Sequence, residues 1–238
     1  MIPRRIIRTN RSAHIFEPVM SGCEAALRAL MPDYEHVFFD DFAARDFIEE
    51  RRPDLLPLYD GFLRNVQRAD LFRMVAVAEL GGFYLDMDVL LFRRLDDLCA
   101  ASVVFPFECE FTPEHFLRRH RCEHTSDEQL PQIGNYGFGA SAGHWFLEEV
   151  ITEIKARSED LTARTHPVNV LWCTGPECLN AVRHRHLDRL RGELHILRGI
   201  PSPEELQACG KDSCNRHDWY HFGSLGTHLM TNTWTVRW

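Results

Sequence analysis

The sequence predicts an α/β fold built around a mainly parallel sheet. Short apolar, β-rich runs alternate with segments whose apolar residues recur at helical spacing. Glycine and proline separate these segments. With 238 residues and 45% hydrophobic content, the chain can form a sizeable core in one domain, or in one domain with a small lobe. In such a sheet, ligands bind outside the carboxyl ends of the strands.

We expect strands at residues 5–9, 35–39, 83–85 and 102–107. We expect helices at residues 23–30, 43–50, 67–80, 145–156 and 176–184. Proline ends or breaks the early helices at positions 32, 53 and 57. The helix over 67–80 has the clearest pattern, because its apolar residues share one face and Gly81-Gly82 stops it. The short apolar run after these glycines indicates a buried strand.

Composition argues against two classes of partner. A formal net charge of -8 disfavours nucleic-acid binding. No apolar stretch approaches the roughly 18 to 20 residues of a membrane span. We therefore expect a soluble chain, either in the cytoplasm or in the secretory-pathway lumen if an anchor was removed. The eight cysteines permit disulfides but need not form them, and a zinc site from Cys109, His120, Cys122 and His124 matches no common spacing.

Two aspartates stand where the buried strand at 83–85 ends. Asp86 and Asp88 point to the same side of an extended segment, and Met87 points to the other. Two close carboxylates repel each other, so a positive group is expected between them, and a hard divalent cation fits. A diphosphate can occupy the open positions of such a metal, which then neutralises the charge of a leaving nucleoside diphosphate. The alternative is that two surface aspartates simply end a strand.

A second pair lies on the preceding helix. Asp70 and Arg73 are three residues apart and share one helix face. They could meet sugar hydroxyls and phosphate beside the metal. In the alternative interpretation they are a capping aspartate and a surface ion pair.

The combined pattern of Asp70-x-x-Arg73 and Gly81-Gly82-Phe83-Tyr84-Leu85-Asp86-Met87-Asp88 resembles the DXD glycosyltransferase family. This family includes yeast-type α-mannosyltransferases, inositol phosphorylceramide mannosyltransferases and lactosylceramide α-galactosyltransferase. The glucosylating domains of large clostridial toxins are more distant relatives. Further similarity lies at residues 2–10, 31–41, 134–138, 143–146 and 174–177.

The resemblance is incomplete at both ends of the chain. Ile7, Arg8 and Asn10 replace the usual His, Gln and Trp of the family's opening segment. His228 stands six residues before Trp234, as in the family's closing pattern, whereas Leu229 and Thr233 depart from it. His221 with Ser224 is a competing alignment.

The resemblance implies a single GT-A type, Rossmann-like domain over residues 1–238, with a mixed, mostly parallel sheet that binds a nucleotide sugar. It also implies hexose transfer from a UDP- or GDP-sugar with retention at the anomeric carbon. The cofactor would be Mn²⁺ or Mg²⁺, and the acceptor a glycan, glycolipid or protein. No nucleic-acid partner is implied.

The expected site residues follow from the same resemblance. The catalytic residues would be Asp86, Asp88 and Arg73, and the metal ligands Asp86, Asp88 and His228. The donor would contact Thr9, Asp70, Arg73, Asp86, Asn135 and Trp234. The acceptor side would hold Asn135 and Glu177. Residues 228–238 would close over the donor, unless Trp234 and Trp238 instead dock into the core.

Two other functions compete. An apolar strand followed by D-x-D also resembles haloacid-dehalogenase-type phosphatases, in which Asp86 would attack phosphate and Asp88 would act as acid and base. That chemistry needs a downstream lysine, and the chain has only Lys155 and Lys211. The second alternative, favoured by the departures from the family pattern, is a glycosyltransferase fold that binds without catalysis.

Overall fold

The computed structural model describes residues 1–111, 130–159, 169–210 and 220–231. A central seven-stranded sheet has the order β2-β1-β3-β7-β5-β6, with β8 pairing β5. Its strands are β1 (Arg5–Thr9), β2 (Glu35–Phe39), β3 (Gly82–Leu85), β5 (Val103–Phe111), β6 (Leu130–Ile133), β7 (Gly137–Ala140) and β8 (Leu194–Leu197). A separate antiparallel pair joins β4 (Val89–Leu91) to β9 (Gly226–His228).

The pairings give the sheet a mixed but mostly parallel character. β1 pairs in parallel with β2 and β3, and β5 pairs in parallel with β8. β7 is antiparallel to both β3 and β5, and β6 is antiparallel to β5. Among the described strands of this sheet, β6 and β7 therefore run against the other five. The predicted mixed, mostly parallel sheet is confirmed.

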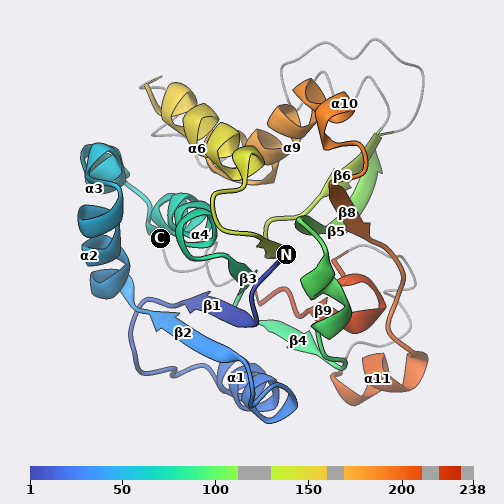
Figure 1. The fold of residues 1–238 in the computed structure, drawn as a ribbon. Helices are drawn as coiled ribbons and strands as arrows, with labels where there is room; N and C mark the ends of the chain where they lie inside the picture. The colour runs from blue at the N-terminus through green and yellow to red at the C-terminus, as the bar shows by residue number, and fades with distance from the viewer. Residues whose placement is uncertain (112–129, 160–168, 211–219, 232–238) are drawn as a thin grey trace.

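The helices lie on both faces of the sheet (Figure 1). Their bounds are α1 (Pro18–Leu30), α2 (Asp41–Arg51), α3 (Leu56–Gly61), α4 (Asn65–Leu80), α6 (Trp145–Ser158), α8 (Asn169–Cys173), α9 (Pro176–Arg185), α10 (Leu187–Leu190) and α11 (Pro203–Ala208). Short 3₁₀ turns cover Pro53–Leu55, Asp96–Ala100 and Gly223–Leu225.

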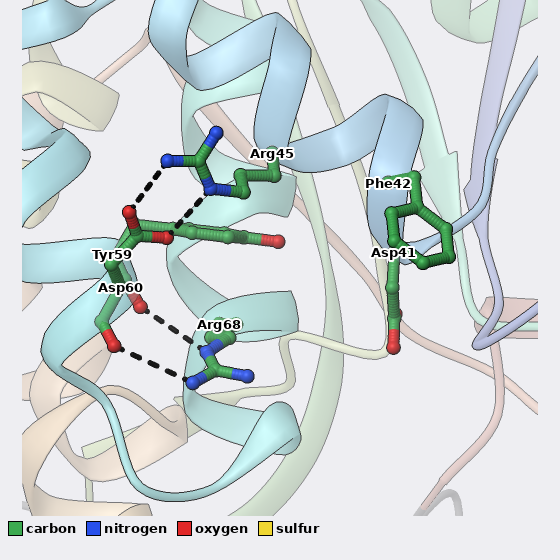
Figure 2. Close-up of a pocket in the computed structure, with 6 residues that line it drawn as sticks. All are labelled: Asp41, Phe42, Arg45, Tyr59, Asp60 and Arg68. Atoms are coloured by element: carbon green, nitrogen blue, oxygen red, sulfur yellow. Dashed lines mark hydrogen bonds and ion pairs between the residues drawn. The ribbon is translucent and has the colours of Figure 1, made fainter.

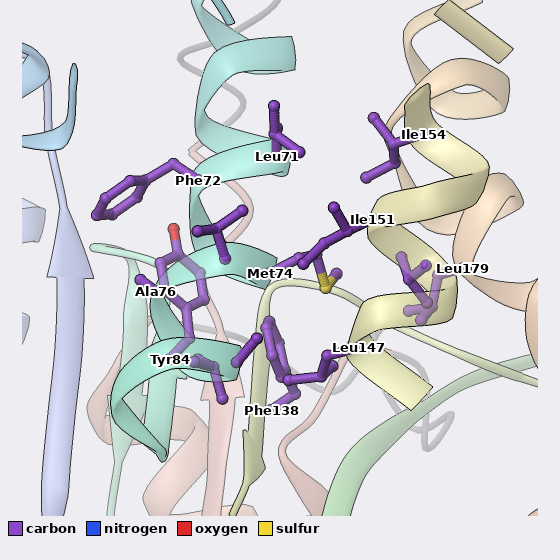
Figure 3. Packing of buried hydrophobic residues seen from close by; sticks show 14 of the residues in the cluster. Leu71, Phe72, Met74, Ala76, Tyr84, Phe138, Leu147, Ile151, Ile154 and Leu179 are labelled. Atoms are coloured by element: carbon purple, nitrogen blue, oxygen red, sulfur yellow. The ribbon is translucent and has the colours of Figure 1, made fainter. Parts of the chain in front are cut away.

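Alternation along the strands creates two cores. On β1, Ile7 faces the larger core with α4, α6 and α9, whereas Ile6 faces the smaller one with α1. On β3, Tyr84 joins the larger core, and Phe83 and Leu85 join the smaller one. Figure 3 shows Leu71, Met74 and Ala76 of α4, with Tyr84 and Phe138, packed beside Leu147, Ile151 and Ile154 of α6. This packing holds α4 beside β3.

Most predicted elements exist with small changes in bounds. β1 and β2 have the expected bounds, and α4 begins two residues earlier than expected. α1 begins at Pro18 rather than residue 23, because proline is well tolerated in the first turn of a helix. No helix in the described segments is long and apolar enough to cross a membrane. Of the four residues of the possible zinc site, Cys109 lies on β5, whereas His120, Cys122 and His124 lie outside the described residues.

Candidate active site

The two aspartates stand at the carboxyl end of β3, in the middle of the sheet. The Asp86 amide donates to the Tyr136 carbonyl oxygen at 2.7 Å, and the Val89 amide donates to the Asp86 carbonyl oxygen at 3.0 Å. The second bond closes a turn that presents Asp88 just before β4. In the β4–β9 pair, Val89 lies opposite His228. Backbone pairing therefore brings His228 to the aspartates across 140 positions of sequence.

Asp86, Asp88 and His228 form a cluster that could hold a metal. One ligand atom from each lies within 4.8 Å of the others. His228 Nε2 is 3.0 Å from Asp88 Oδ1. Two carboxylates and one imidazole fit a divalent cation such as Mn²⁺. The donor set thus has the chemistry that the predicted metal requires.

The Asp88 carboxylate is held from several directions. Its side chain is 9% exposed, and Thr231 donates both its amide, at 2.9 Å, and its hydroxyl, at 2.8 Å, to Oδ2. Burial alone would raise the pKa of Asp88, but His228 and the bonds from Thr231 hold this pKa far below its usual range. Asp88 is therefore ionised at neutral pH.

Asp86 is held by side chains from inside the fold. The Tyr84 hydroxyl donates to Asp86 Oδ1 at 2.7 Å, and Arg73 Nη1 lies 3.4 Å from the same oxygen. The Arg73 guanidinium also stacks over the Tyr84 ring, 4.8 Å from its centroid. The positive charge expected near the paired carboxylates is thus supplied partly by Arg73, and by His228 when that ring is protonated.

Asp70 and Arg73 form a buried network, not the surface ion pair of the alternative interpretation. Arg73 Nη2 lies 3.3 Å from Asp70 Oδ1, and Arg73 Nη1 donates to the Asn135 carbonyl oxygen at 2.8 Å. Asp70 accepts from the Asn135 amide at 3.1 Å and from the Thr174 hydroxyl at 2.9 Å. Burial raises the pKa of Asp70 to about 6, although Arg73 and these hydrogen bonds oppose the change.

Two of the remaining predicted residues, Thr9 and Glu177, lie at the ends of their elements. Thr9 ends β1, where its hydroxyl donates to the Phe39 carbonyl oxygen at 3.0 Å. Glu177 is buried in the first turn of α9, three residues after Thr174. Trp234 and the predicted lid beyond Thr231 lie outside the described residues.

A separate hollow of about 220 Å³ lies between α2, α3 and the start of α4 (Figure 2). Its lining is Asp41, Phe42, Arg45, Tyr59, Asp60 and Arg68. Arg68 and Asp70 are two positions apart on α4, so they point to nearly opposite sides of that helix. The hollow is therefore distinct from the aspartate cluster.

Four residues of the site were not predicted from the sequence as functional. Tyr84 and Tyr136 contact the Asp86–His228 region, Thr231 holds Asp88, and Thr174 holds Asp70. The sequence could have indicated Tyr84, because it lies two residues before Asp86 and therefore points to the same side of the strand. The other three come from distant segments, and only the tertiary structure brings them in.

Arg8, one of the departures from the family pattern, also reaches the site. Its side chain is buried, pairs with Glu24 of α1 at 2.8 Å and donates to the Asp86 carbonyl oxygen at 2.8 Å. The arginine therefore links α1 to the turn that carries the two aspartates.

Comparison with known proteins agrees with this geometry. Residues 18–105 match the family described as "Glycosyltransferase sugar-binding region containing DXD motif". Residues 18–105 are thus similar to the DXD sugar-binding region of glycosyltransferases. That region spans α1 to the start of β5 and includes Asp70, Arg73, Asp86 and Asp88. The predicted resemblance is confirmed.

Two curated relatives are fission-yeast enzymes. The chain is 38% identical over 181 residues to inositol phosphoceramide mannosyltransferase 3 of Schizosaccharomyces pombe, covering 76% of this chain and 44% of that protein. It is 36% identical over 98 residues to inositol phosphoceramide mannosyltransferase 2 of the same yeast, covering 41% and 28%. The chain thus spans less than half the length of the curated relatives it matches.

The fold is that of GT-A glycosyltransferases, as predicted. The ligand-free glycosyltransferase domain of the YGT toxin superposes with a TM-score of 0.54 at 9% identity, covering 82% of this chain and 80% of that one. At this sequence identity the structural likeness supports the fold alone. The evidence for glycosyl transfer is the match to the sugar-binding region.

Proposed function

We propose that this chain is a metal-dependent, retaining glycosyltransferase that moves a hexose from a UDP- or GDP-sugar to an acceptor. The observation that carries the proposal is the cluster of Asp86, Asp88 and His228 beside the buried network of Asp70, Arg73 and Asn135. The first group has the chemistry of a divalent metal site, and the second offers polar groups suited to sugar hydroxyls. The matched sugar-binding region supports the same conclusion.

Each residue has a distinct task in this proposal. Asp86, Asp88 and His228 hold Mn²⁺ or Mg²⁺, which when bound neutralises charge on the departing nucleoside diphosphate. Asp70 and Asn135 hold the sugar, and Thr9, at the end of β1, lies on the nucleotide side. Arg73 pairs with both Asp70 and Asp86, and it supplies positive charge toward the donor phosphate. Asn135 and Glu177 border the acceptor.

The relatives suggest which substrates to test first. The two fission-yeast proteins are named as mannosyltransferases acting on inositol phosphoceramide. We therefore propose mannose as the first donor sugar, and an acceptor that carries a hydroxyl-rich phosphodiester head group. Product stereochemistry, read by NMR at the new anomeric carbon, tests the proposed retention.

The deciding experiment is a thermal-shift screen of UDP- and GDP-sugars, each with Mn²⁺ and with EDTA. A ligand present at 100 times its dissociation constant should stabilise the fold by about 2.7 kcal/mol. We expect one nucleotide class to raise the melting temperature with Mn²⁺ and not with EDTA. Donor hydrolysis under the same conditions separates an active enzyme from a binding protein of the same fold. No shift with any nucleotide sugar would contradict the proposal.

Within the described residues, the site gives the phosphatase alternative no lysine beside Asp88. The groups that contact Asp88 are His228 and Thr231, whereas Lys155 lies in the last turn of α6 and Lys211 lies outside the described residues. The matched region and the fold both belong to glycosyltransferases.

A further inference from the structure

Tyr136 contacts two of the three residues that would hold the metal. Its ring stacks on the His228 imidazole, with centroids 4.7 Å apart and planes inclined by 3°. Its carbonyl oxygen accepts the Asp86 amide at 2.7 Å. Its hydroxyl donates to the His221 carbonyl oxygen at 2.9 Å. One residue of the β6–β7 loop therefore joins the end of β3 to the C-terminal segment.

The stacked ring fixes the plane of the His228 imidazole. His228 ends β9, a strand of only three residues, so the backbone alone constrains the imidazole weakly. Rotation of the ring about its Cβ–Cγ bond would carry Nε2 away from Asp88. The parallel Tyr136 ring resists tilting of the imidazole out of this plane, in which Nε2 lies 3.0 Å from Asp88 Oδ1. A metal ligand must be held to within about 0.5 Å by its supporting residues.

The Tyr136 ring is itself anchored. The residue is 5% exposed and packs in the smaller core with Phe222. Its hydroxyl bond reaches His221, whose Nδ1 lies 2.9 Å from Thr227 Oγ1, one residue before His228. Tyr136 and His228 are thus linked through His221 and Thr227.

We infer that Tyr136 is a positioning residue that orients His228 and thereby sets the affinity of the metal site. This inference rests on the proposed metal-dependent function. It assigns a role to a side chain outside the D-x-D motif and outside the predicted ligands. The competing interpretation is that Tyr136 only fills the core, in which case its loss would lower stability and leave metal binding unchanged.

The test measures binding of Mn²⁺ alone, without donor, from the loss of the free-ion EPR signal. Tyr136→Leu should bind Mn²⁺ at least about 10-fold more weakly than the wild type, the usual cost of losing a residue that orients a ligand. Tyr136→Phe keeps the ring and should stay within about 3-fold. Wild-type affinity in Tyr136→Leu, or a Phe variant as weak as the Leu variant, would overturn the inference.

Two controls separate positioning from stability. Tyr34 is a buried tyrosine in the same core, and its hydroxyl bonds to Asp96, away from the metal ligands. Tyr34→Leu should lower the melting temperature and keep wild-type Mn²⁺ affinity. In a His228→Ala background, Tyr136→Leu should change Mn²⁺ affinity by less than about 2-fold, because the group it orients is gone. A full additional loss in that background would contradict action through His228.

A metal-free readout separates this inference from the proposed function. Stacking should shift the His228 ring protons upfield in the NMR spectrum, and this shift should persist in Tyr136→Phe and vanish in Tyr136→Leu. If the wild type shows the shift and binds no Mn²⁺, the proposed metal function fails while the positioning of His228 stands. If the metal-free wild type shows no such shift, the inference about Tyr136 fails even if Mn²⁺ binds.

Discussion

Asp88 has two roles. It is a proposed metal ligand, and its carboxylate accepts two hydrogen bonds from Thr231. Asp88→Asn should lower turnover by at least about 100-fold, since a metal that stabilises the leaving group contributes several kcal/mol. It should also lower the stability of the metal-free protein by about 1 to 3 kcal/mol, because the native carboxylate accepts several charge-assisted bonds. Steady-state kinetics and urea unfolding in EDTA measure the two effects.

Asp97→Asn is the matched control for that change. Asp97 is exposed on a neighbouring 3₁₀ turn and makes no ion pair within the described residues. It should leave turnover and stability unchanged. Retained turnover in Asp88→Asn, together with a large loss of stability, would assign Asp88 a structural role only.

Asp70 gives the site a pH-dependent stability of known sign. Its pKa is raised by burial from 3.8 to about 6, so the folded state binds this proton more tightly than the unfolded state. The charged groups facing it are Arg73 from α4 and Asp86 from the end of β3. Its stability contribution is therefore fully present below about pH 4 and is lost as the pH rises through about 6.

The corresponding variant is Asp70→Asn, which cannot titrate. Between pH 4.5 and 7.5, the unfolding free energy of the variant relative to wild type should shift in the variant's favour by about 2 kcal/mol. Urea unfolding at four pH values measures this difference. A difference that stays constant across the range would show that Asp70 keeps an ordinary pKa in the fold.

At the scale of elements, the sequence predicts a helix or strand correctly where residues within that element determine its structure. α4 was predicted because its apolar spacing and terminal glycines are local signals. β7 (Gly137–Ala140) was not predicted, since two glycines in four residues give it little strand propensity. β4 and β9 are three residues each and exist because they pair with each other. Such elements are defined by a distant partner and carry no periodicity of their own.

Gly82 lies in the tight turn from α4 into β3, where the backbone passes close to β1. Its φ is 116°, and a Cβ there would lie 2.7 Å from the Arg5 carbonyl oxygen. Gly82→Ala should therefore cost about 2 to 4 kcal/mol of unfolding free energy through backbone strain and overpacking. Gly22→Ala is the control, because Gly22 lies in α1 with nothing within 4 Å, and it should stabilise by about 0.5 to 1 kcal/mol. Equal effects in the two variants would refute the close approach of β3 to β1.

At the scale of the whole molecule, the site is assembled from segments that the sequence keeps far apart. The spacing of Asp86 and Asp88 predicted paired carboxylates, and the resemblance placed His228 with them. Their proximity in the structure depends on the β4–β9 pairing, and the support of His228 depends on Tyr136 from the β6–β7 loop. Such tertiary contacts leave no periodic signal along the chain. The ligand residue types could therefore be predicted, whereas the residues that orient them could not.

This assembly predicts how the metal should act on the fold. A cation shared by Asp86, Asp88 and His228 would link the end of β3 to β9, so bound metal should suppress local opening of the C-terminal segment. With Mn²⁺ and UDP or GDP at about 100 times their dissociation constants, the amides of residues 226–229 should exchange hydrogen up to about 100-fold more slowly. The amides of α2 serve as the control, because that helix packs against β2 and holds no ligand. Hydrogen-exchange mass spectrometry measures both segments in one experiment, with EDTA as the reference state. Slowing at residues 226–229 without slowing in α2 would show that the metal connects the end of β3 to β9. Unchanged exchange there, or equal slowing in α2, would contradict the shared site.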